Sequence, residues 1–447
     1  MRHEKQPIAR KKTMETLMSA VSPALRVSEE AAYRKVAWRL MPLLLFCYLV
    51  SYLDRVNVGF AKLQMAGDLG LSDAAYGLGA GIFFLGYFLF EVPSNLILHR
   101  VGARVWIARI MVTWGAVSAL TMFVTTPAAF YAMRLLLGAA EAGFFPGVIL
   151  YLTYWYPARR RGRITTLFMT AVALSGVVGG PISGYILKAF DGIHGWHGWQ
   201  WLYLLEGLPS IVAGLLVYAR LDDRIAHAKW LSEDERALLE RHVNAEEAVK
   251  SQLSLGAVFV NPRVWLMCAI YFSFVIGLYG VGFWLPTLIH ATGVADPLRI
   301  GLLSTVPYAL AVVAMTAVAR SSDRHRERRW HLALPGAMGT IGLVLAVGWA
   351  HQTGLAVAAL ALATAGILTA IPLFWSLPTA FLGGTAAAAG IAVINSIGNL
   401  AGFLGPYLMG LLAQWTASND AGLYLMAGCM TLGGLLALSL PKTLVNR

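Results

Sequence analysis

Long apolar stretches recur along almost the whole chain, and they constrain its fold more than any other feature. A helix that crosses the hydrocarbon core of a bilayer needs about 20 predominantly apolar residues, and the sequence provides about twelve such segments between short polar connectors. Only 13% of the residues are charged, about half the share found in soluble domains. The sequence therefore predicts an all-α polytopic membrane protein. We expect the spans at 40–62, 75–97, 105–124, 128–151, 163–187, 199–219, 264–289, 300–319, 331–350, 355–378, 385–413 and 421–440.

The basic residues alternate between the two sides of these predicted spans. If the chain starts in the cytoplasm, 30 of the 35 Lys and Arg residues fall on the cytoplasmic side. The exceptions are Lys62, Lys188 and Arg299 on the outside, and Arg55 and Arg134 within spans. The positive-inside rule then predicts that both termini lie in the cytoplasm, and we expect the protein in a bacterial inner membrane. No soluble domain carries the net charge of +12, so we do not expect nucleic acid as a partner.

A charged segment at 220–256 divides the chain, with six predicted spans before it and six after it. Within it, Ser232 and Glu235 match a capping box that would open a short surface helix. The expected organisation is a cytoplasmic tail (1–35), a six-helix bundle (36–219), a central cytoplasmic loop (220–256), a second six-helix bundle (257–441) and a cytoplasmic tail (442–447).

Two pairs of similar segments indicate that the two halves are related. Basic connectors follow the second span at 99–104 and the eighth span at 323–328, and glycine–proline clusters lie in the fifth span at 176–181 and the eleventh at 402–406. Such clusters in matching positions are typical of helices that repack when a transporter alternates its access. Close helix packing alone explains small residues equally well, and both interpretations stay open.

The sequence contains no motif of an enzyme or a metal centre. Cys47, Cys268 and Cys429 all fall in apolar spans, so we expect neither a disulfide framework nor a metal site. We find no phosphate-binding loop, metal-ligand cluster or nucleophile–base arrangement. We therefore predict that the protein is not an enzyme and uses no cofactor.

The first span carries the densest group of polar side chains. Placing a charge at the bilayer centre costs at least about 2.5–3.5 kcal/mol, so such a residue calls for a partner or a function. Tyr48, Tyr52 and Arg55 share one helical face, and a guanidinium beside phenol hydroxyls suits a carboxylate. Asp54 is expected to point toward a neighbouring span. Alternatively, Asp54 and Arg55 only pair with other helices to hold the bundle together.

Three acidic residues in other spans invite different interpretations. Glu141 lies near the middle of the fourth span, seven residues after Arg134 and on the same helical face. A low-dielectric environment favours the neutral carboxyl and a nearby guanidinium favours the charged one, so Glu141 is suited to load and release a proton. We predict Glu141 as the leading proton carrier and Asp54 as the second; a permanent ion pair of Glu141 with an arginine stays open. Glu91 and Glu206 are expected to stabilise contacts between helices or contacts at a gate, rather than to touch substrate.

Aromatic and amide side chains, rather than charges, mark the second half. Tyr279 lies in the seventh span, Trp375 and Ser376 in the tenth, and Asn395 and Asn399 one turn apart in the eleventh. Amides can hydrogen-bond a carboxylate or hydroxyl, and aromatic rings can flank an organic body. Packing, interfacial anchoring or hydrogen bonds between helices remain alternatives for each of them.

Together these features resemble the major facilitator superfamily and, within it, the anion:cation symporters. The resemblance extends from about residue 36 to 440. Segments 79–87 and 374–380 are most similar to bacterial permeases for tartrate, phthalate and related carboxylates. The segments that carry the wider resemblance are 52–57, 134–143, 230–232 and 395–406.

The resemblance implies proton-coupled uptake of a small organic anion by rocker-switch alternating access, by a monomer in the lipid bilayer. It implies that Arg55 binds the substrate carboxylate and that Asp54 and Glu141 take part in proton coupling. Phthalate would suit a cavity rich in Tyr and Trp, and tartrate or a sugar acid fits almost as well. An exporter or antiporter of drugs or metabolites would share the same fold. The residues that the resemblance implies as lining the site are Tyr52, Tyr87, Trp375, Ser376, Asn395 and Asn399.

The cytoplasmic connectors supply the candidates for a gate. Relatives in this superfamily usually have an aspartate at the position of His99, whereas Asp323 keeps that position in the second half. Because of this departure, the sequence does not define the charge network on the N-terminal side of the gate. The predicted gate residues are Arg100, Arg104, Asp323 and Arg324.

Overall fold

The computed structural model describes residues 23–247, 261–375, 377–378 and 384–442. This described part is helical and contains no strand, and it includes 12 helical segments long and apolar enough to cross a membrane, which confirms the predicted fold class. The long helices are α2 (Pro23–Asp68), α3 (Asp73–Val101), α4 (Ala103–Leu120), α5 (Pro127–Glu141), α6 (Phe144–Thr153), α7 (Ala158–Ala189), α8 (Gly198–Arg220), α9 (Glu233–Glu247), α11 (Pro262–Ala291), α12 (Pro297–His325), α13 (Arg329–Gly348), α14 (Thr353–Phe374), α16 (Gly384–Thr416) and α17 (Asp420–Ser439).

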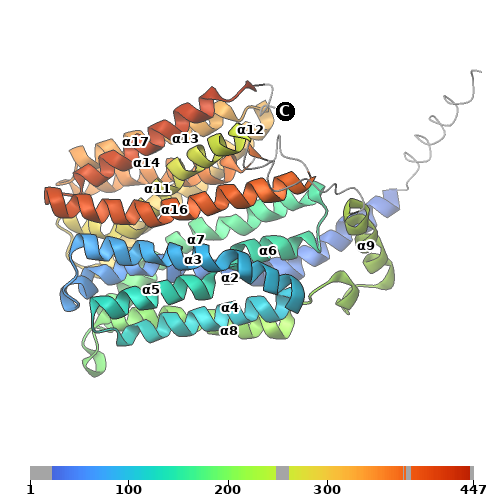
Figure 1. Cartoon of the computed structure of the whole chain (residues 1–447), viewed down its shortest axis with the longest axis horizontal. Helices are drawn as coiled ribbons and strands as arrows, with labels where there is room; N and C mark the ends of the chain where they lie inside the picture. Colours follow the sequence, from blue (N-terminus) through green and yellow to red (C-terminus); the bar gives the residue numbers. More distant parts are fainter. Residues whose placement is uncertain (1–22, 248–260, 376, 379–383, 443–447) are drawn as a thin grey trace, which may run out of the picture.

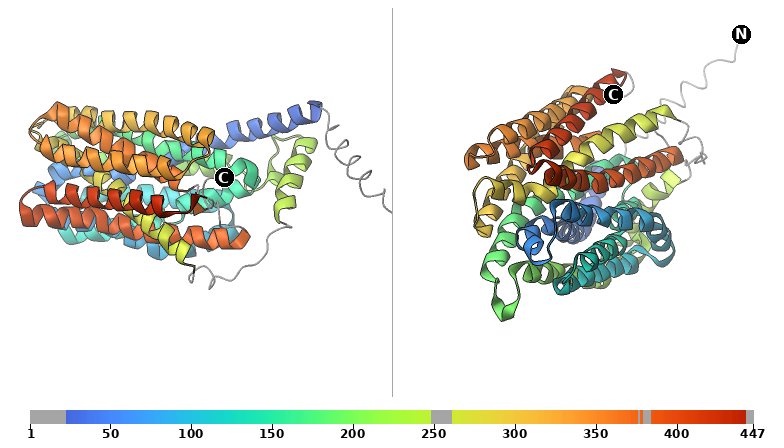
Figure 2. Two further views of the ribbon diagram at one scale, coloured as in Figure 1. Left: turned by 90° about the horizontal axis from the view of Figure 1, so that it is seen from above. Right: turned by 60° about the vertical axis from the view of Figure 1, so that its left-hand side comes forward.

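The spanning helices lie roughly parallel and form two groups (Figure 1). In the first bundle, α2 to α8, α4 packs against α8 and α3 against α5; in the second bundle, α11 to α17, α13 packs against α14 and α17. The two bundles meet mainly where α3 contacts α16 and α7 contacts α12. The first described helix begins and the last one ends at the same end of the molecule, here called the termini end (Figure 2). The opposite end is called the far end.

Polar residues at the loop ends fix where several spanning helices begin. Ser72 and Thr126 each accept a hydrogen bond from a backbone N–H of the first turn of α3 and α5. Asn261 and Asp296 do the same for α11 and α12. These side chains satisfy backbone donors that the helix itself leaves without a partner. The helix starts are thus encoded locally, while the apolar length between them is set by the bilayer.

The predicted capping box in the central segment is confirmed. The Ser232 backbone N–H donates to Glu235 Oε2 at 2.9 Å, and the Glu235 backbone N–H donates to Ser232 Oγ at 3.2 Å. Glu235 also pairs with Lys35 of α2 at 2.8 Å, and this hydrogen bond holds the pKa of Glu235 below its ordinary value. The capping box therefore opens α9, and the ion pair attaches α9 to the first bundle.

The predicted fourth span over 128–151 is confirmed as a span at Pro127–Thr153, but its helix is interrupted. The chain forms α5 and α6 with a break between them, where Gly143 adopts a φ of 85°. This left-handed conformation is unfavourable for a residue with a Cβ. A Cβ at Gly143 would also collide with the side chain of Ser94. The break therefore requires glycine, and it places Glu141 at the last position of α5.

Glycines bring the two bundles into close contact at the far end. Gly77 of α3 packs on the backbone carbonyl of Pro406 in α16, and Gly180 of α7 packs on that of Gly301 in α12. A side chain at either glycine would collide with this backbone. Small residues at helix interfaces permit such close approach. The glycine clusters seen in the sequence thus serve packing across the interface between the bundles.

Polar contacts across the same interface reinforce this closure. Tyr76 donates its hydroxyl to the carbonyl oxygen of Phe283 at 2.9 Å, which joins α3 to α11. Lys188, in the last turn of α7, pairs with Asp296 at the start of α12 at 3.0 Å. In this structure the far end is therefore the side on which the two bundles are held together.

Candidate functional site

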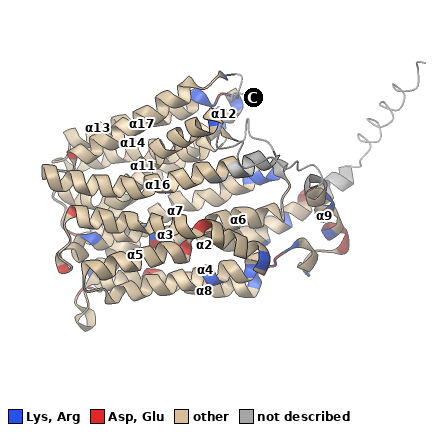
Figure 3. Cartoon of the chain, viewed as in Figure 1, with Lys and Arg blue, Asp and Glu red and all other residues tan. Residues whose placement is uncertain are grey.

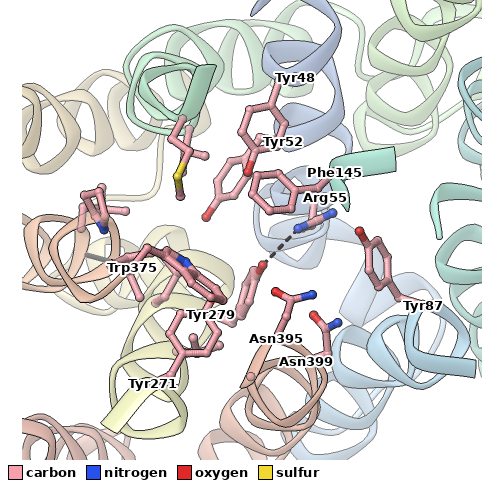
Figure 4. Close-up of a pocket in the computed structure, with 18 of the residues that line it drawn as sticks. Tyr48, Tyr52, Arg55, Tyr87, Phe145, Tyr271, Tyr279, Trp375, Asn395 and Asn399 are labelled. Atoms are coloured by element: carbon pink, nitrogen blue, oxygen red, sulfur yellow. Dashed lines mark hydrogen bonds between the residues drawn. The ribbon is translucent and has the colours of Figure 1, made fainter. Parts of the chain in front are cut away.

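A central cavity of about 80 Å³ lies between the two bundles (Figure 4). Helices α2, α3, α6 and α7 of the first bundle and α11, α12, α14 and α16 of the second contribute to its walls. Seven of the eight predicted substrate-binding residues line it, and Ser376 lies outside the described residues. The seven are Tyr52, Arg55, Tyr87, Tyr279, Trp375, Asn395 and Asn399.

Arg55 is the cationic residue among the described residues that line this cavity. Its Nη1 donates to the hydroxyl of Tyr279 at 3.0 Å, across the interface between the bundles. Its guanidinium carbon lies 5.3 Å from the ring centroid of Phe83 and 5.5 Å from that of Tyr87. These cation–π contacts hold the guanidinium in place while it stays accessible from the cavity.

Glu141 forms an ion pair with Arg55 from behind the cavity wall. Its Oε1 accepts hydrogen bonds from Arg55 Nη2 and, at 2.9 Å, from Ser51 Oγ. Glu141 is 1% exposed and does not itself line the cavity. The ion pair that the sequence left open is therefore present in this conformation. Its arginine is Arg55 of α2, whereas Arg134 donates to the backbone carbonyls of residues 79 and 80.

Asp54 points away from the cavity into the first bundle, as the sequence predicted. Its carboxylate accepts hydrogen bonds from Trp114 Nε1 at 2.7 Å, Ser118 Oγ at 2.9 Å and Ser210 Oγ at 2.7 Å. Asp54 is 1% exposed, and its partners belong to α4 and α8. Three donors of this kind stabilise a buried carboxylate. The geometry suits a role in holding the bundle together, and a role in proton coupling stays a prediction.

Glu91 joins the two bundles beside the cavity. Its Oε1 accepts a hydrogen bond from Asn395 Nδ2 at 2.8 Å, and its Oε2 accepts one from Asn399 Nδ2 at 2.9 Å. The sequence interpretation of Glu91 as a residue of helix or gate contacts agrees with this geometry. Glu206, the other acid so interpreted, accepts a hydrogen bond from Ser183 at 2.6 Å inside the first bundle.

Of the predicted gate residues Arg100, Arg104, Asp323 and Arg324, Arg104 has hydrogen bonds that the structure describes, and the gate stays a prediction. Arg104 donates through Nε to the carbonyl oxygen of Tyr218 at 2.6 Å, and its backbone N–H donates to Asp223 at 2.8 Å. Both partners belong to the first bundle or the segment after it. Arg100 and Arg324 are exposed, and the side chain of Asp323 lies outside the described residues. In this conformation Arg104 thus organises its own bundle.

The sequence did not predict the burial of Lys62, and two cavity-lining tyrosines were left out of the predicted substrate-binding residues. Lys62 is 7% exposed, pairs with Asp73 at 2.7 Å, and places its ammonium 3.5 Å from the ring centroid of Trp284 in the second bundle. Tyr48 and Tyr271 line the cavity but were not among the predicted substrate-binding residues. The spacing of Tyr48, four residues before Tyr52, had nevertheless placed it on the helical face of Arg55.

Comparison with known proteins identifies the family. The sequence model described as Major Facilitator Superfamily matches residues 44–406. The chain therefore belongs to this superfamily. A solved structure of the Escherichia coli xylose transporter XylE, described as partially occluded and inward open, superimposes with a TM-score of 0.69 at 13% identity, covering 89% of this chain and 97% of that one. At that identity the likeness supports the fold alone.

Curated relatives extend over nearly the whole chain. A Pseudomonas putida protein provisionally named as a metabolite transport protein, NicT, is 51% identical over 94% of this chain and 96% of its own length. An Agrobacterium vitis protein provisionally named as a tartrate transporter is 48% identical, with 93% and 96% covered. An Acinetobacter baumannii quinolone resistance transporter is 42% identical, with 91% and 94% covered.

The fold and these relatives define the class of protein. The chain is a multi-pass membrane transporter of the major facilitator type, and its relatives are transporters rather than enzymes. The similarity to a tartrate transporter agrees with the resemblance to organic-acid permeases drawn from the sequence.

Proposed function

We propose that this protein is a proton-coupled symporter that imports a small organic carboxylate, such as tartrate, another sugar acid or phthalate, by alternating access. The observation that carries the proposal is the position of Arg55. Its guanidinium lines the central cavity between the bundles, and its carboxylate partner, Glu141, lies behind it. A guanidinium at this place can present two parallel donors to a carboxylate that enters the cavity.

Charge balance explains why proton and anion travel together. In the empty cavity Arg55 and Glu141 neutralise each other, and an anion that enters would leave one buried negative charge in excess. If Glu141 takes up a proton, Arg55 is released to bind the substrate carboxylate and the site keeps its net charge. Proton uptake by Glu141 and anion binding by Arg55 therefore favour one another.

The other walls of the cavity suit the organic body of the substrate. Tyr271 and Trp375 lie 4.9 Å apart between ring centroids, and both face the cavity from the second bundle (Figure 4). Rings of this kind bind planar or apolar surface, while their polar atoms can contact hydroxyl groups. The hydroxyl of Tyr279 lies beside Arg55 and can contact the same carboxylate.

The distribution of charge supports an orientation with the termini end in the cytoplasm. Basic residues gather at the termini end of the molecule (Figure 3). Under the positive-inside rule this end faces the cytoplasm of a bacterial inner membrane. The far end, where the bundles are held together, then faces outward. In this orientation the contacts at the far end support a state that is closed toward the outside.

Uptake into proteoliposomes tests the proposal. Aliphatic and aromatic carboxylates are offered to the purified protein with and without an inward pH gradient. We expect at least one of them to accumulate when the outside is acidic, and we expect the Arg55→Lys variant to lose this uptake. Accumulation of no carboxylate, or accumulation that ignores the pH gradient, contradicts the proposal.

An exporter is the second candidate, and the similarity to a quinolone resistance transporter favours it. Such a protein would move substrate outward in exchange for protons. Proteoliposomes separate the two candidates, because an inward pH gradient drives net uptake through a symporter and net efflux through an antiporter of the same orientation.

A further inference from the structure

Two amides of the second bundle hold a carboxylate of the first. Asn395 and Asn399 lie one turn apart on α16, and each donates to a different oxygen of Glu91. Both asparagines also line the cavity, where the close-up places them between Tyr279 and Tyr87 (Figure 4). Two amide N–H groups directed at the two oxygens of one carboxylate form a binding site for a carboxylate.

Glu91, the carboxylate that occupies this site, is an unusual residue for the interior of a membrane protein. Glu91 is 8% exposed, and among the described side chains its hydrogen-bond partners are these two neutral amides. Arg55 interacts with Glu91 electrostatically but, among the described contacts, without a hydrogen bond. A buried carboxylate whose hydrogen-bond donors are neutral is costly, and such residues in spanning helices mark functional sites. The amide pair therefore holds a negative charge beside the cavity and could hold another in its place.

The same arrangement occurs at Arg55. There, a donor group that lines the cavity is occupied by Glu141, again a carboxylate of the first bundle. The empty cavity thus has two sets of carboxylate donors, and the chain's own side chains fill both. One set belongs to α2 in the first bundle, and the other belongs to α16 in the second.

We propose that the amides of Asn395 and Asn399 form a second carboxylate subsite, which Glu91 occupies until substrate arrives, and that the preferred substrate is a dicarboxylate. One substrate carboxylate displaces Glu141 from Arg55, and the other displaces Glu91 from the amides. This inference rests on the proposed function, because it requires Arg55 to bind a carboxylate.

The charges balance when two protons accompany each dicarboxylate. Before binding, the ion pair of Arg55 and Glu141 is neutral and Glu91 carries one negative charge. After binding, Glu141 and Glu91 have each taken one proton from the solution on the open side, and Arg55 offsets one of the two substrate charges. The buried site carries one negative charge in both states. A monocarboxylate displaces Glu141 alone and brings one proton.

Displacement of Glu91 also replaces a contact between the bundles. The hydrogen bonds of Glu91 join α3 to α16 directly. A dicarboxylate that binds both Arg55 and the amides joins α2 to α16 instead. The substrate thereby takes over the connection between the two bundles at the centre of the molecule, and a monocarboxylate leaves the original connection in place.

Calorimetric counting of protons tests the inference. The purified full-length protein is titrated with tartrate and with glycerate, which lacks the second carboxylate, in buffers of different ionisation enthalpy and at a pH where both ligands are fully ionised. Phthalate and benzoate form the matched pair for aromatic ligands. We expect the uptake of two protons with the dicarboxylate and of one with the monocarboxylate. Affinity should then fall about 100-fold per pH unit for the former and about tenfold for the latter.

The Glu91→Gln variant should take up one proton with the dicarboxylate instead of two. The matched control is Glu206→Gln, which removes a buried carboxylate that does not line the cavity, and it should still take up two. The Asn399→Leu variant provides a second measurement that does not depend on the folding of the first. Added to Glu91→Ala, in which the amides have lost their internal carboxylate, it should reduce the preference for dicarboxylate over monocarboxylate about tenfold relative to Glu91→Ala alone, because one hydrogen bond to the substrate is lost.

Equal proton counts for the two ligands, or two protons with Glu91→Gln, overturn the second subsite. An unchanged ligand preference when Asn399→Leu is added to Glu91→Ala overturns it as well. These results differ from failure of the proposed function itself. In that case no carboxylate binds in a manner that depends on Arg55, and neither ligand brings a proton.

Discussion

The two bundles share a fold but divide the chemistry of the membrane interior between them. Every buried charged side chain among the described residues belongs to the first bundle: Asp54, Arg55, Lys62, Glu91, Arg134, Glu141 and Glu206. The buried polar side chains of the second bundle are hydroxyl groups of Ser and Thr, and its cavity wall consists of aromatic, aliphatic and amide side chains.

This difference assigns different tasks to the two bundles. Under the proposed function, the first bundle carries the charged groups that would bind the anion and the proton. The second offers shape, aromatic surface and amide donors, which discriminate between organic bodies. Changes in the first bundle should therefore affect whether transport and coupling occur, and changes in the second should affect which substrate is preferred.

The largest expected effect belongs to Arg55. A lysine there keeps the charge but loses the planar pair of donors. We expect the Arg55→Lys variant to bind carboxylates about 10- to 100-fold more weakly, corresponding to about 1.5–3 kcal/mol for a hydrogen bond to a charged group. Thermal-shift titration with the carboxylate panel measures this. The matched control is Arg299→Lys at an exposed position, and it should bind carboxylates normally. Near-normal affinity of Arg55→Lys would show that Arg55 does not bind the substrate carboxylate.

Glu141 should separate coupling from binding. In the Glu141→Gln variant no proton can be exchanged at this position, while Arg55 remains free to bind substrate. For a monocarboxylate, which brings one proton through Glu141 alone, we expect proton-driven accumulation to be lost and counterflow exchange between the two sides to persist. Proteoliposomes measured with and without a pH gradient provide both values. If the variant still concentrates a monocarboxylate under the gradient, the proton is carried by another residue.

Trp375 tests the second bundle. Replacement by Ala removes a ring from the cavity wall, and such a ring contributes about 0.5–1.5 kcal/mol beyond its buried area. We expect the Trp375→Ala variant to lose affinity for an aromatic carboxylate about tenfold and to bind an aliphatic one with a smaller change. Competition binding with both classes measures the ratio. An equal loss for both classes would weaken the division of tasks between the bundles.

The smallest effect is expected where the bundles meet at the far end. The exposed pair Lys188–Asp296 lowers the pKa of Asp296 through its hydrogen bond with Lys188. A carboxylate with a lowered pKa stabilises the paired, closed state above its ordinary pKa, and this contribution is lost as the pH falls through the lowered value. Acid should therefore favour opening of the far end. In the Lys188→Gln variant this pH dependence should disappear. The measurement is the rate at which a thiol reagent labels a cysteine introduced on the cavity side of the pair, and this rate should change by at most a few-fold.

Features within one helix could be predicted from the sequence, because helical spacing determines which side chains share a face. The common face of Tyr48, Tyr52 and Arg55 follows from this rule, and all three line the cavity. The opposite direction of Asp54 follows from the same spacing. The apolar length of the spans likewise predicted the fold class without any knowledge of the packing.

Features between helices could not be predicted in this way. The partner of Glu141 is Arg55 from another helix. The sequence pointed instead to Arg134, because that arginine lies in the same span as Glu141. The hydrogen bonds of Glu91 with Asn395 and Asn399 link positions about 300 residues apart, and no local spacing encodes such a contact. Pairing of this kind depends on how the two bundles dock, which periodicity does not specify.

The glycine contacts at the far end have a consequence for the energy economy of the cell. Gly77 and Gly180 leave no room for a side chain between the facing backbones, so this seal has little space for a continuous file of water. A larger residue at either position would wedge the bundles apart. The resulting leak would dissipate the proton-motive force even when no nutrient is present, and it would appear as slower growth of a cell that merely carries the variant.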